Sequence, residues 1–323
     1  MKKVLAIILS AILTLGTLAG CTSAEDKKEK ALVNAVMLKG PTGVGAVKLM
    51  EDSENKKTEG NYNITIAASP DEITGKILNG EADIAAVPTN LASVLYNKTK
   101  GEVSVIAVNT LGVLYVLENG NTINSISDLS GKTVYSSGKG AVPEYVFNHI
   151  LNENGVTDAE VVYVSEHAEA ATALLSGNCD VAVLPEPNVT AVTMKNENIR
   201  IALDITEEWD KISGNDMAMG CVIVRNEFLK ENKEAVEEFL DEYEDSIEFV
   251  NENVKEASLL VEKFGIMASA AAAEKAIPNC NICFIDGDEM KAVLEGFYKV
   301  LFEAQPKSVG GKLPEVDFYL DED

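Results

Sequence analysis

One sequence pattern occurs twice in this chain, in residues 77–94 and again in residues 174–191. Each copy reads as the end of a helix, a glycine that stops it, a short apolar strand and a proline-marked turn that opens the next helix. Three residues recur in register: Gly80 with Gly177, Asp83 with Asp180, and Pro88 with Pro185. Unbroken apolar strands are typical of parallel sheets that helices cover on both faces. Two equivalent α/β units therefore predict two lobes with a binding site between them.

Apolar strands and helical segments alternate along both halves of the chain. We expect strands at residues 33–38, 62–67, 84–87, 103–108 and 112–117, and then at residues 133–136, 161–164, 181–184, 199–203 and 217–224. This alternation predicts an α/β fold in which each lobe is a doubly wound, mainly parallel sheet flanked by helices, with a cleft between the lobes. From residue 226 onward the pattern is helical, with segments at residues 233–250, 254–264 and 286–302 before an extended tail.

The order of these elements predicts a discontinuous first lobe. Residues 31–116 together with residues 217–323 would form lobe 1, and residues 117–216 would form an inserted lobe 2. The long apolar stretch that begins at Met217 would carry the chain back to lobe 1. Two crossings between the lobes, near residues 111–117 and 216–222, would then form the hinge.

The first residues predict export from the cytoplasm. Two lysines precede an apolar run at residues 4–15, and the sequence Leu-Ala-Gly-Cys ends at Cys21. A basic start, a short apolar core and a small-residue cleavage site indicate a secretory signal at residues 1–20 rather than a membrane span. Leu-Ala-Gly-Cys resembles the bacterial lipobox, which implies cleavage before Cys21 and a lipid on its thiol. An ordinary cleaved signal is the alternative. Residues 21–30 would form a charged, flexible tether.

The charge balance argues against one class of partner. The chain has 52 acidic and 27 basic residues, which gives a formal net charge of −25. A chain with this charge repels phosphate backbones, so we expect no nucleic-acid binding. The excess acid fits a solvated surface that keeps the protein soluble.

Motifs for metal binding and catalysis are weak. Cys280-Asn-Ile-Cys283 stands without a second such pair or a nearby histidine, which argues against zinc and leaves a local disulfide or two free thiols open. The two histidines, His149 and His167, fit no hydrolase or metalloprotease motif, although His167 begins a helix and could reach the cleft. We therefore expect no catalytic residues, no metal and no cofactor.

A glycine-containing loop follows the first strand of each predicted lobe. One loop includes Gly40, Pro41, Thr42 and Gly43, and the other includes Ser137, Gly138, Lys139 and Gly140. Backbone amides and hydroxyl groups at the start of a helix can hold an anion or a polar head group. Tight turns and plain helix capping are the alternative. The first loop is not a P-loop, because no Gly-Lys-Ser/Thr follows at the required spacing.

Further polar residues follow other predicted strands. Ser69 follows the second strand, and Thr89-Asn90 and Glu186-Pro187 occupy equivalent positions in the two copies of the repeat. In open α/β sheets ligands bind at the carboxyl ends of the strands. Several helix N-termini favour a polar or anionic solute there, whereas Glu186 would suit a cationic or hydrogen-bond-donating group. The predicted ligand site therefore consists of the two loops with Ser69, Thr89, Asn90 and Glu186, and helix capping is again the alternative.

The mature chain as a whole resembles an extracytoplasmic solute-binding protein of an ABC transporter, in the NMT1/THI5-like and SsuA-like branch. The lipobox that ends at Cys21, the phrase Ser-Asp-Leu-Ser-Gly-Lys at residues 127–132 and the Gly-x-x-Asp-[Ile/Val]-Ala repeats at Gly80 and Gly177 carry this resemblance. It implies a type II periplasmic-binding-protein fold and a lipid-anchored monomer on the extracytoplasmic face of the cell membrane. It also implies a permease with its ATPase as partner, and relatives bind sulfonates, pyrimidine precursors, nitrate and other small solutes.

The resemblance leaves two other functions open. One is an enzyme similar to a pyrimidine-precursor synthase of thiamine biosynthesis or to enzymes of a menaquinone route, and the other is a sensor that reports a ligand to a membrane kinase. The signal segment argues against the enzymes, because those work in the cytoplasm. The preferred interpretation is a non-enzymatic lipoprotein that captures a small polar or anionic solute by hinge closure and delivers it to the permease.

Overall fold

The computed structural model describes residues 30–320. The predicted signal segment, Cys21 and the predicted tether up to residue 29 lie outside these residues. Within the described part, no helix combines the length and the apolar character that crossing a bilayer requires.

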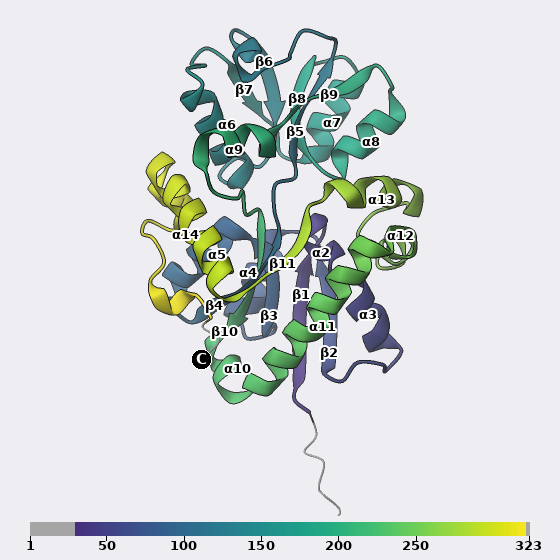
Figure 1. Cartoon of the computed structure of the whole chain (residues 1–323), viewed down its shortest axis with the longest axis vertical. Coiled ribbons are helices and arrows are strands. Elements are labelled where there is room, and N and C mark those ends of the chain that lie inside the picture. The colour runs from purple at the N-terminus through teal and green to yellow at the C-terminus, as the bar shows by residue number, and fades with distance from the viewer. Residues whose placement is uncertain (1–29, 321–323) are drawn as a thin grey trace, which may run out of the picture. The chain divides into compact units, whose positions relative to one another are not determined.

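The first sheet contains six strands in the order β11-β4-β10-β3-β1-β2 (Figure 1). Strands β1, β2 and β3 are mutually parallel, while β10 runs antiparallel to β3 and β4 on its two sides, and β11 runs antiparallel to β4. The strands are β1 (Leu32–Leu38), β2 (Asn61–Ala67), β3 (Ile84–Pro88), β4 (Val103–Thr110), β10 (Gly220–Arg225) and β11 (Ile282–Ile285). The sheet is therefore built from the early part of the chain and completed by two later strands.

The second sheet contains five strands in the order β7-β6-β8-β5-β9. Strand β6 is parallel to β7 and β8, and β5 is antiparallel to β8 and β9. The strands are β5 (Leu114–Asn119), β6 (Thr133–Ser136), β7 (Glu160–Tyr163), β8 (Val181–Pro185) and β9 (Ile199–Asp204). The two copies of the sequence repeat thus supply β3 to one sheet and β8 to the other, each inside its sheet with neighbours on both sides.

Helices flank both sheets. In the first half they are α2 (Pro41–Val44), α3 (Val47–Glu54), α4 (Pro70–Leu78), α5 (Thr89–Thr99), η1 (Ile126–Leu129), α6 (Val142–Glu153) and α7 (His167–Leu175). The later ones are α8 (Asn188–Lys195), α9 (Ile205–Ser213), α10 (Asn226–Glu231), α11 (Lys233–Glu252), α12 (Val254–Lys263), α13 (Ala270–Ala276), η2 (Ile277–Asn279), α14 (Gly287–Ala304), η3 (Pro306–Val309) and η4 (Val316–Phe318). Figure 1 shows α11 and α14 lying across the first sheet.

Strand β3 shows why the repeated strands are apolar without alternation. Its successive residues Ile84 and Ala85 are both fully buried but belong to different hydrophobic clusters on the two faces of the sheet. A strand covered on both faces buries every side chain, which explains the unbroken apolar run. One of these clusters continues into the second sheet, and Trp209 of α9 and Phe297 of α14 meet within it with ring centroids 5.5 Å apart.

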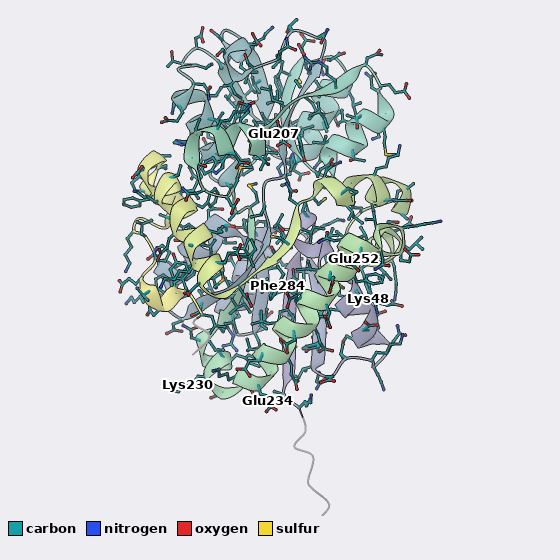
Figure 2. All side chains as sticks on the ribbon, viewed as in Figure 1. Lys48, Glu207, Lys230, Glu234, Glu252 and Phe284 are labelled. Atoms are coloured by element: carbon teal, nitrogen blue, oxygen red, sulfur yellow. The ribbon has the colours of Figure 1, made fainter. Side chains whose placement is uncertain are left out.

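The expected strands are confirmed with shifts of one to a few residues at their ends. The largest shifts at the start of a strand concern β5, which begins at Leu114 rather than at residue 112, and β10, which begins at Gly220 rather than at residue 217. The sequence reasoning missed β11, a short strand that overlaps the Cys280–Cys283 segment and includes Cys283. Phe284 of β11 packs edge-on against Tyr243 of α11 with ring centroids 6.4 Å apart, and Figure 2 marks its position.

The expectation of an extended tail is wrong. After α14 the chain forms the short helices η3 and η4, and Val309 and Phe318 are fully buried. Tyr319 forms a parallel bridge with Val105 of β4, and the Leu320 N–H donates to the Val105 carbonyl at 3.0 Å. The apolar residues of this segment, Val309, Leu313, Val316 and residues 318–320, follow neither a strand nor a helix period, so sequence periodicity does not predict that the segment packs.

Candidate functional site

The carboxyl ends of the parallel strands lie beside the two chain crossings in both sheets. At the end of β3, Pro88 pairs with Gly220, and Gly220 also pairs with Thr110 at the end of β4. In the second sheet Pro185 at the end of β8 pairs with Leu114, the first residue of β5. The crossings at residues 111–113 and 214–219 therefore join the two edges that carry the predicted site residues.

A buried polar cluster holds the loop after β1. The Asn109 side-chain amide donates to the Thr42 carbonyl at 3.0 Å and to the Tyr243 hydroxyl at 2.9 Å, which uses both of its N–H groups. The Thr110 hydroxyl donates to Asn109 Oδ1 at 3.2 Å. A Cβ atom on Gly220 would lie 2.8 Å from Asn109 Oδ1 and 3.0 Å from Thr42 Oγ1. The loop is thus packed tightly on the sheet edge, and glycine at residue 220 permits this approach.

The other members of this loop have backbone roles. Gly40 caps α2 with φ of 116°, a conformation that favours glycine, and Pro41 occupies the first turn of that helix. A Cβ atom on Gly43 would lie 2.4 Å from the Leu38 carbonyl oxygen, so this residue also has to be a glycine. The sequence requirement for two glycines here is therefore explained by local geometry as well as by a possible ligand.

Ser69 and Lys139 are the most exposed side chains of the predicted set. The Ser69 hydroxyl accepts the Glu72 N–H at 3.3 Å, so it caps α4 as the sequence alternative proposed. Lys139 lies between Gly138 and Gly140, whose φ values of 77° and 78° shape the turn after β6. Both side chains sit at the expected edge without burial by the described residues.

Thr89 and Asn90 are buried at the start of α5. The Thr89 carbonyl accepts the Tyr298 hydroxyl at 2.9 Å, and the Asn90 side-chain amide donates to the Ser308 carbonyl at 3.4 Å. Within residues 30–320, Thr89 Oγ1 and Asn90 Oδ1 are buried without a hydrogen-bond partner. Buried polar atoms are normally paired, and these two atoms are exceptions. They therefore have hydrogen-bonding capacity that the described chain does not use.

A serine and a histidine meet at the edge of the second sheet. Ser137 follows β6, His167 is the first residue of α7, and the Ser137 hydroxyl is hydrogen-bonded to His167 Nδ1. Ser137 is only 2% exposed. Burial lowers the pKa of His167, so its ring is neutral at pH 7. The sequence analysis placed His167 near the cleft without assigning it a role.

Glu186 is engaged by groups of the protein. It is 1% exposed, and its two carboxylate oxygens accept the Thr190 N–H at 3.1 Å and the Thr190 hydroxyl at 2.9 Å. Burial raises the pKa of Glu186, against the opposing hydrogen bonds from Thr190 and Asn279. The Tyr115 hydroxyl of β5 donates to the Asn279 carbonyl at 3.3 Å. Glu186 and Tyr115 thus connect the second sheet with η2, which belongs to a segment packed on the first sheet.

Three hollows lie away from the predicted residues. The largest, about 580 Å³, is at the opposite edge of the second sheet and is lined by residues such as Glu118, Thr133 and Val181. A second of about 370 Å³ lies between α9 and α14 beside Asp210 and Asp216, and a third of about 270 Å³ lies beside Tyr62. These hollows are lined by none of the predicted ligand residues.

The structure also describes the Cys280–Cys283 segment and the side chains that could bind a metal. Cys280 and Cys283 are free thiols in this structure, which decides between the two alternatives left open by the sequence. Within residues 30–320, no cluster of His, Cys, Asp or Glu has an arrangement that could hold a metal ion.

The sequence reasoning missed several polar residues at the sheet edges. Asn109 and Thr110 end an otherwise apolar strand, and a polar pair in that position is a detectable sign of a strand end. Tyr115 lies inside an apolar strand, and Asn279 lies in a short helix, so neither carries a local sign of its contact. Their meeting depends on how α13 and η2 pack, which pattern analysis does not reach.

Comparison with known proteins gives one family. The profile of the family described as NMT1/THI5 like matches residues 61–257. No curated protein sequence matches the chain.

Solved structures share the fold at low sequence identity. An ABC transporter protein from Parabacteroides distasonis has 24% identity and a TM-score of 0.78, covering 90% of this chain and 99% of that one. The periplasmic aliphatic sulphonate binding protein SsuA from Escherichia coli has 15% identity and a TM-score of 0.72, covering 88% and 96%. The periplasmic nitrate-binding protein NrtA from Synechocystis PCC 6803 has 10% identity and a TM-score of 0.60, covering 87% and 84%. The fold is thus the two-lobed periplasmic-binding-protein fold.

Proposed function

Because this chain belongs to the NMT1/THI5-like family, we propose that it is the solute-binding protein of an ABC importer and is not an enzyme. Its solute is a small polar or anionic molecule. The names of the structural neighbours support this class, since they include binding proteins for a sulphonate and for nitrate.

The observation that carries the proposal is the joining of two polar sheet edges by the crossings. The residues after β3 include two buried oxygens that the described chain leaves without a partner, Thr89 Oγ1 and Asn90 Oδ1, and the loop after β6 includes Ser137 and two glycines. The crossings at residues 111–113 and 214–219 lead from one edge to the other. Ligands of open α/β sheets bind at such edges. The proposed site consists of Gly40, Pro41, Thr42, Gly43, Ser69, Thr89, Asn90, Ser137, Gly138, Lys139, Gly140 and Glu186. Glu186 and Asn90 belong to this site because of their position at the strand ends. Their side chains already form hydrogen bonds with other parts of the chain.

The proposed mechanism is closure of two lobes around the solute. Lobe 1 is residues 31–116 with 217–323, lobe 2 is residues 117–216, and the crossings act as the hinge. A solute shifts such an equilibrium only by its differential affinity for the closed state, so it has to contact both lobes. Thr89 in one lobe and Ser137 in the other mark the two sides of the site on which closure depends.

Thermal unfolding of the mature protein with a panel of small solutes tests this function. The panel contains alkanesulfonates, nitrate, sulfate, pyrimidines and a set of neutral and cationic metabolites. A solute at a hundred times its Kd stabilises the folded state by about 2.7 kcal/mol, which is a shift easily measured. Thr89→Val and Ser137→Ala are each expected to weaken the binding of the solute that is found. Binding that both folded variants retain at full strength would refute the placement of the site.

The proposal includes anchoring of the chain to the membrane through Cys21. Two acyl chains are needed for firm attachment, whereas one binds marginally. Export with a lipid on Cys21 would place a monomeric binding protein on the extracytoplasmic face of the cell membrane, beside a permease with its ATPase. Labelled fatty acid should appear in the wild-type chain and be missing from Cys21→Ala, and equal labelling of both chains would contradict the anchor.

A further inference from the structure

The surroundings of Ser137 determine which of the two side chains, Ser137 or His167, donates the hydrogen bond between them. Ser137 is almost fully buried, and among the described residues the only group its hydroxyl contacts is His167 Nδ1. If Nδ1 carried the ring proton, it would donate to the serine oxygen and the buried serine proton would have no acceptor. A buried unpaired donor is unfavourable, so the serine donates its proton to an unprotonated Nδ1.

This direction fixes the histidine tautomer. Burial keeps the ring neutral at pH 7, so only one ring nitrogen carries a proton. With Nδ1 accepting from Ser137, that proton is on Nε2. Within residues 30–320, no group accepts a hydrogen bond from Nε2, and His167 is more exposed than Ser137. The Nε2–H group of His167 is therefore an oriented hydrogen-bond donor that the described chain does not use.

The location of this donor connects it with the proposed site. Ser137 follows β6 and His167 follows β7, two parallel strands whose last residues Ser136 and Tyr163 are paired. Strand β6 is also parallel to β8, whose last residue, Pro185, pairs with Leu114 beside the first crossing. Ser137 and His167 thus lie on the edge that leads to the other lobe.

We propose that His167 is a solute-contacting residue of lobe 2, that its Nε2–H donates to an oxygen of an anionic solute, and that Ser137 is the positioning residue that holds this tautomer. The inference rests on the proposed solute-binding function and assigns that site a preference for hydrogen-bond acceptors. A neutral donor also lets so acidic a protein accept an anion at an edge where Lys139, a cation of the described residues, is exposed.

Nitrogen NMR of histidine-labelled protein tests the tautomer without knowledge of the natural solute. The chain has two histidines, so the two rings give separable signals that His149→Gln assigns. We expect a protonated Nε2 and an unprotonated Nδ1 for His167 in the wild type, and a mixture of tautomers in Ser137→Ala. A proton found on Nδ1 of the wild-type ring overturns the inference.

Titration with methanesulfonate, nitrate and sulfate tests the contact. At least one of these anions should move the His167 ring signals. The affinity of that anion should fall about tenfold in His167→Phe, which keeps a ring but has no donor, since a hydrogen bond to a charged group is lost. His167→Gln places an amide N–H where Nε2–H was and should restore binding to within a few-fold of wild type. His149→Gln should leave the affinity unchanged, because His149 lies in α6, where its ring is tilted against Trp209 of α9 with ring centroids 5.6 Å apart.

The outcomes separate this inference from the proposed function. If an anion or another solute of the wider panel stabilises the protein while the His167 signals stay unmoved, the binding function stands and the His167 contact is refuted. If His167→Phe binds the anion as tightly as wild type, the contact is refuted as well. If no solute of the wider panel changes the spectrum or the thermal stability, the proposed function fails together with it.

Discussion

The two copies of the sequence repeat form the same backbone elements, but the side chains at equivalent positions differ in their contacts and exposure. In the first copy Asp83 is 5% exposed and pairs with Arg225 at 2.9 Å, and in the second copy Asp180 is exposed. After the strands, Thr89 of the first copy leaves its hydroxyl unpaired, whereas Glu186 of the second has both oxygens engaged by Thr190. Equal sequence positions therefore do not imply equal roles.

This difference separates the shared backbone framework of the motif from its variable polar residues. The glycine stop and the buried strand are common to both copies, because each makes an inner strand of a covered sheet. The contacts of the polar residues differ because each copy has a different neighbouring strand, β10 in one sheet and β5 in the other. The first copy keeps hydrogen-bonding capacity at its edge, and the second uses its capacity to join the second sheet to η2 through Asn279.

The aspartates should give the largest contrast. Asp83 accepts the Asn34 N–H at 3.0 Å and its side-chain amide at 3.1 Å in addition to the Arg225 ion pair. Asp83→Ala removes the buried partner of the Arg225 guanidinium, which keeps only the exposed Glu227 carboxylate and the Ala82 carbonyl, and it removes the acceptor of two Asn34 N–H groups. The free energy of unfolding should therefore fall by about 3 kcal/mol. The matched change Asp180→Ala should stay within about 0.5 kcal/mol. Denaturant titration of both variants measures the contrast, and similar losses would show that the two positions are equivalent after all.

The threonines near the strand ends should differ less, and in opposite directions. Thr190→Val removes a hydroxyl that the buried Glu186 carboxylate accepts, and should cost about 1–3 kcal/mol of unfolding free energy. Thr89→Val replaces an unpaired buried hydroxyl with a methyl group of the same shape, so it should be neutral or slightly stabilising. A destabilisation by Thr89→Val as large as that by Thr190→Val would mean that the Thr89 hydroxyl has a partner in the folded chain.

Glu186 should also make stability depend on pH. Its pKa in the folded chain is raised by burial above the usual value of 4.5, so the folded state holds the proton more tightly than the unfolded state. The stabilisation is fully present below pH 4.5 and is lost as the pH rises through the raised pKa. Unfolding free energies of wild type and Glu186→Gln should therefore shift in favour of the variant as the pH increases from 4 to 7. An exposed control, Glu197→Gln, should show no such shift, and parallel curves for wild type and Glu186→Gln would contradict the raised pKa.

Much of the fold could be predicted, because the apolar pattern and the length of most strands are visible in the sequence itself. The apolar runs at β3 and β8 and the glycines that precede them determine an inner strand wherever they occur. Strand β11 could not be predicted, because Ile282–Ile285 is short and its pairing with β4 joins residues far apart in the chain. The packed segment after α14 was missed for the same reason, since contacts such as Leu320 to Val105 are not local.

The positions of the candidate residues at the sheet edges could be predicted, but their contacts could not. Strand-to-helix junctions place Thr42, Thr89 and Ser137 at sheet edges whatever the rest of the chain does. The partners of those residues come from elsewhere, as Asn109 does for Thr42 and His167 does for Ser137. Pairings of this kind depend on three-dimensional packing between strands, so a single sequence does not reveal them.

The glycines should give the smallest contrast between the two copies, because they share one geometry. Gly80 and Gly177 have φ of 71° and 73°, and the residue after each donates to the carbonyl five positions earlier, at 2.8 Å and 2.9 Å. This is the Schellman arrangement that ends a helix on a left-handed residue. A Cβ atom would meet Arg225 at 3.7 Å in the first copy and nothing within 4 Å in the second, so neither substitution is opposed by crowding.

Gly80→Ala and Gly177→Ala should therefore each cost about 1 kcal/mol of unfolding free energy, from the left-handed backbone alone. The two costs should agree to within about 0.5 kcal/mol. Gly75→Ala is the matched control, because Gly75 lies inside α4 with open space around it and should gain about 0.5–1 kcal/mol. Chemical denaturation of the three variants measures this. Unequal costs for Gly80 and Gly177 would show that the copies differ in their backbone frame and not only in the polar residues attached to it.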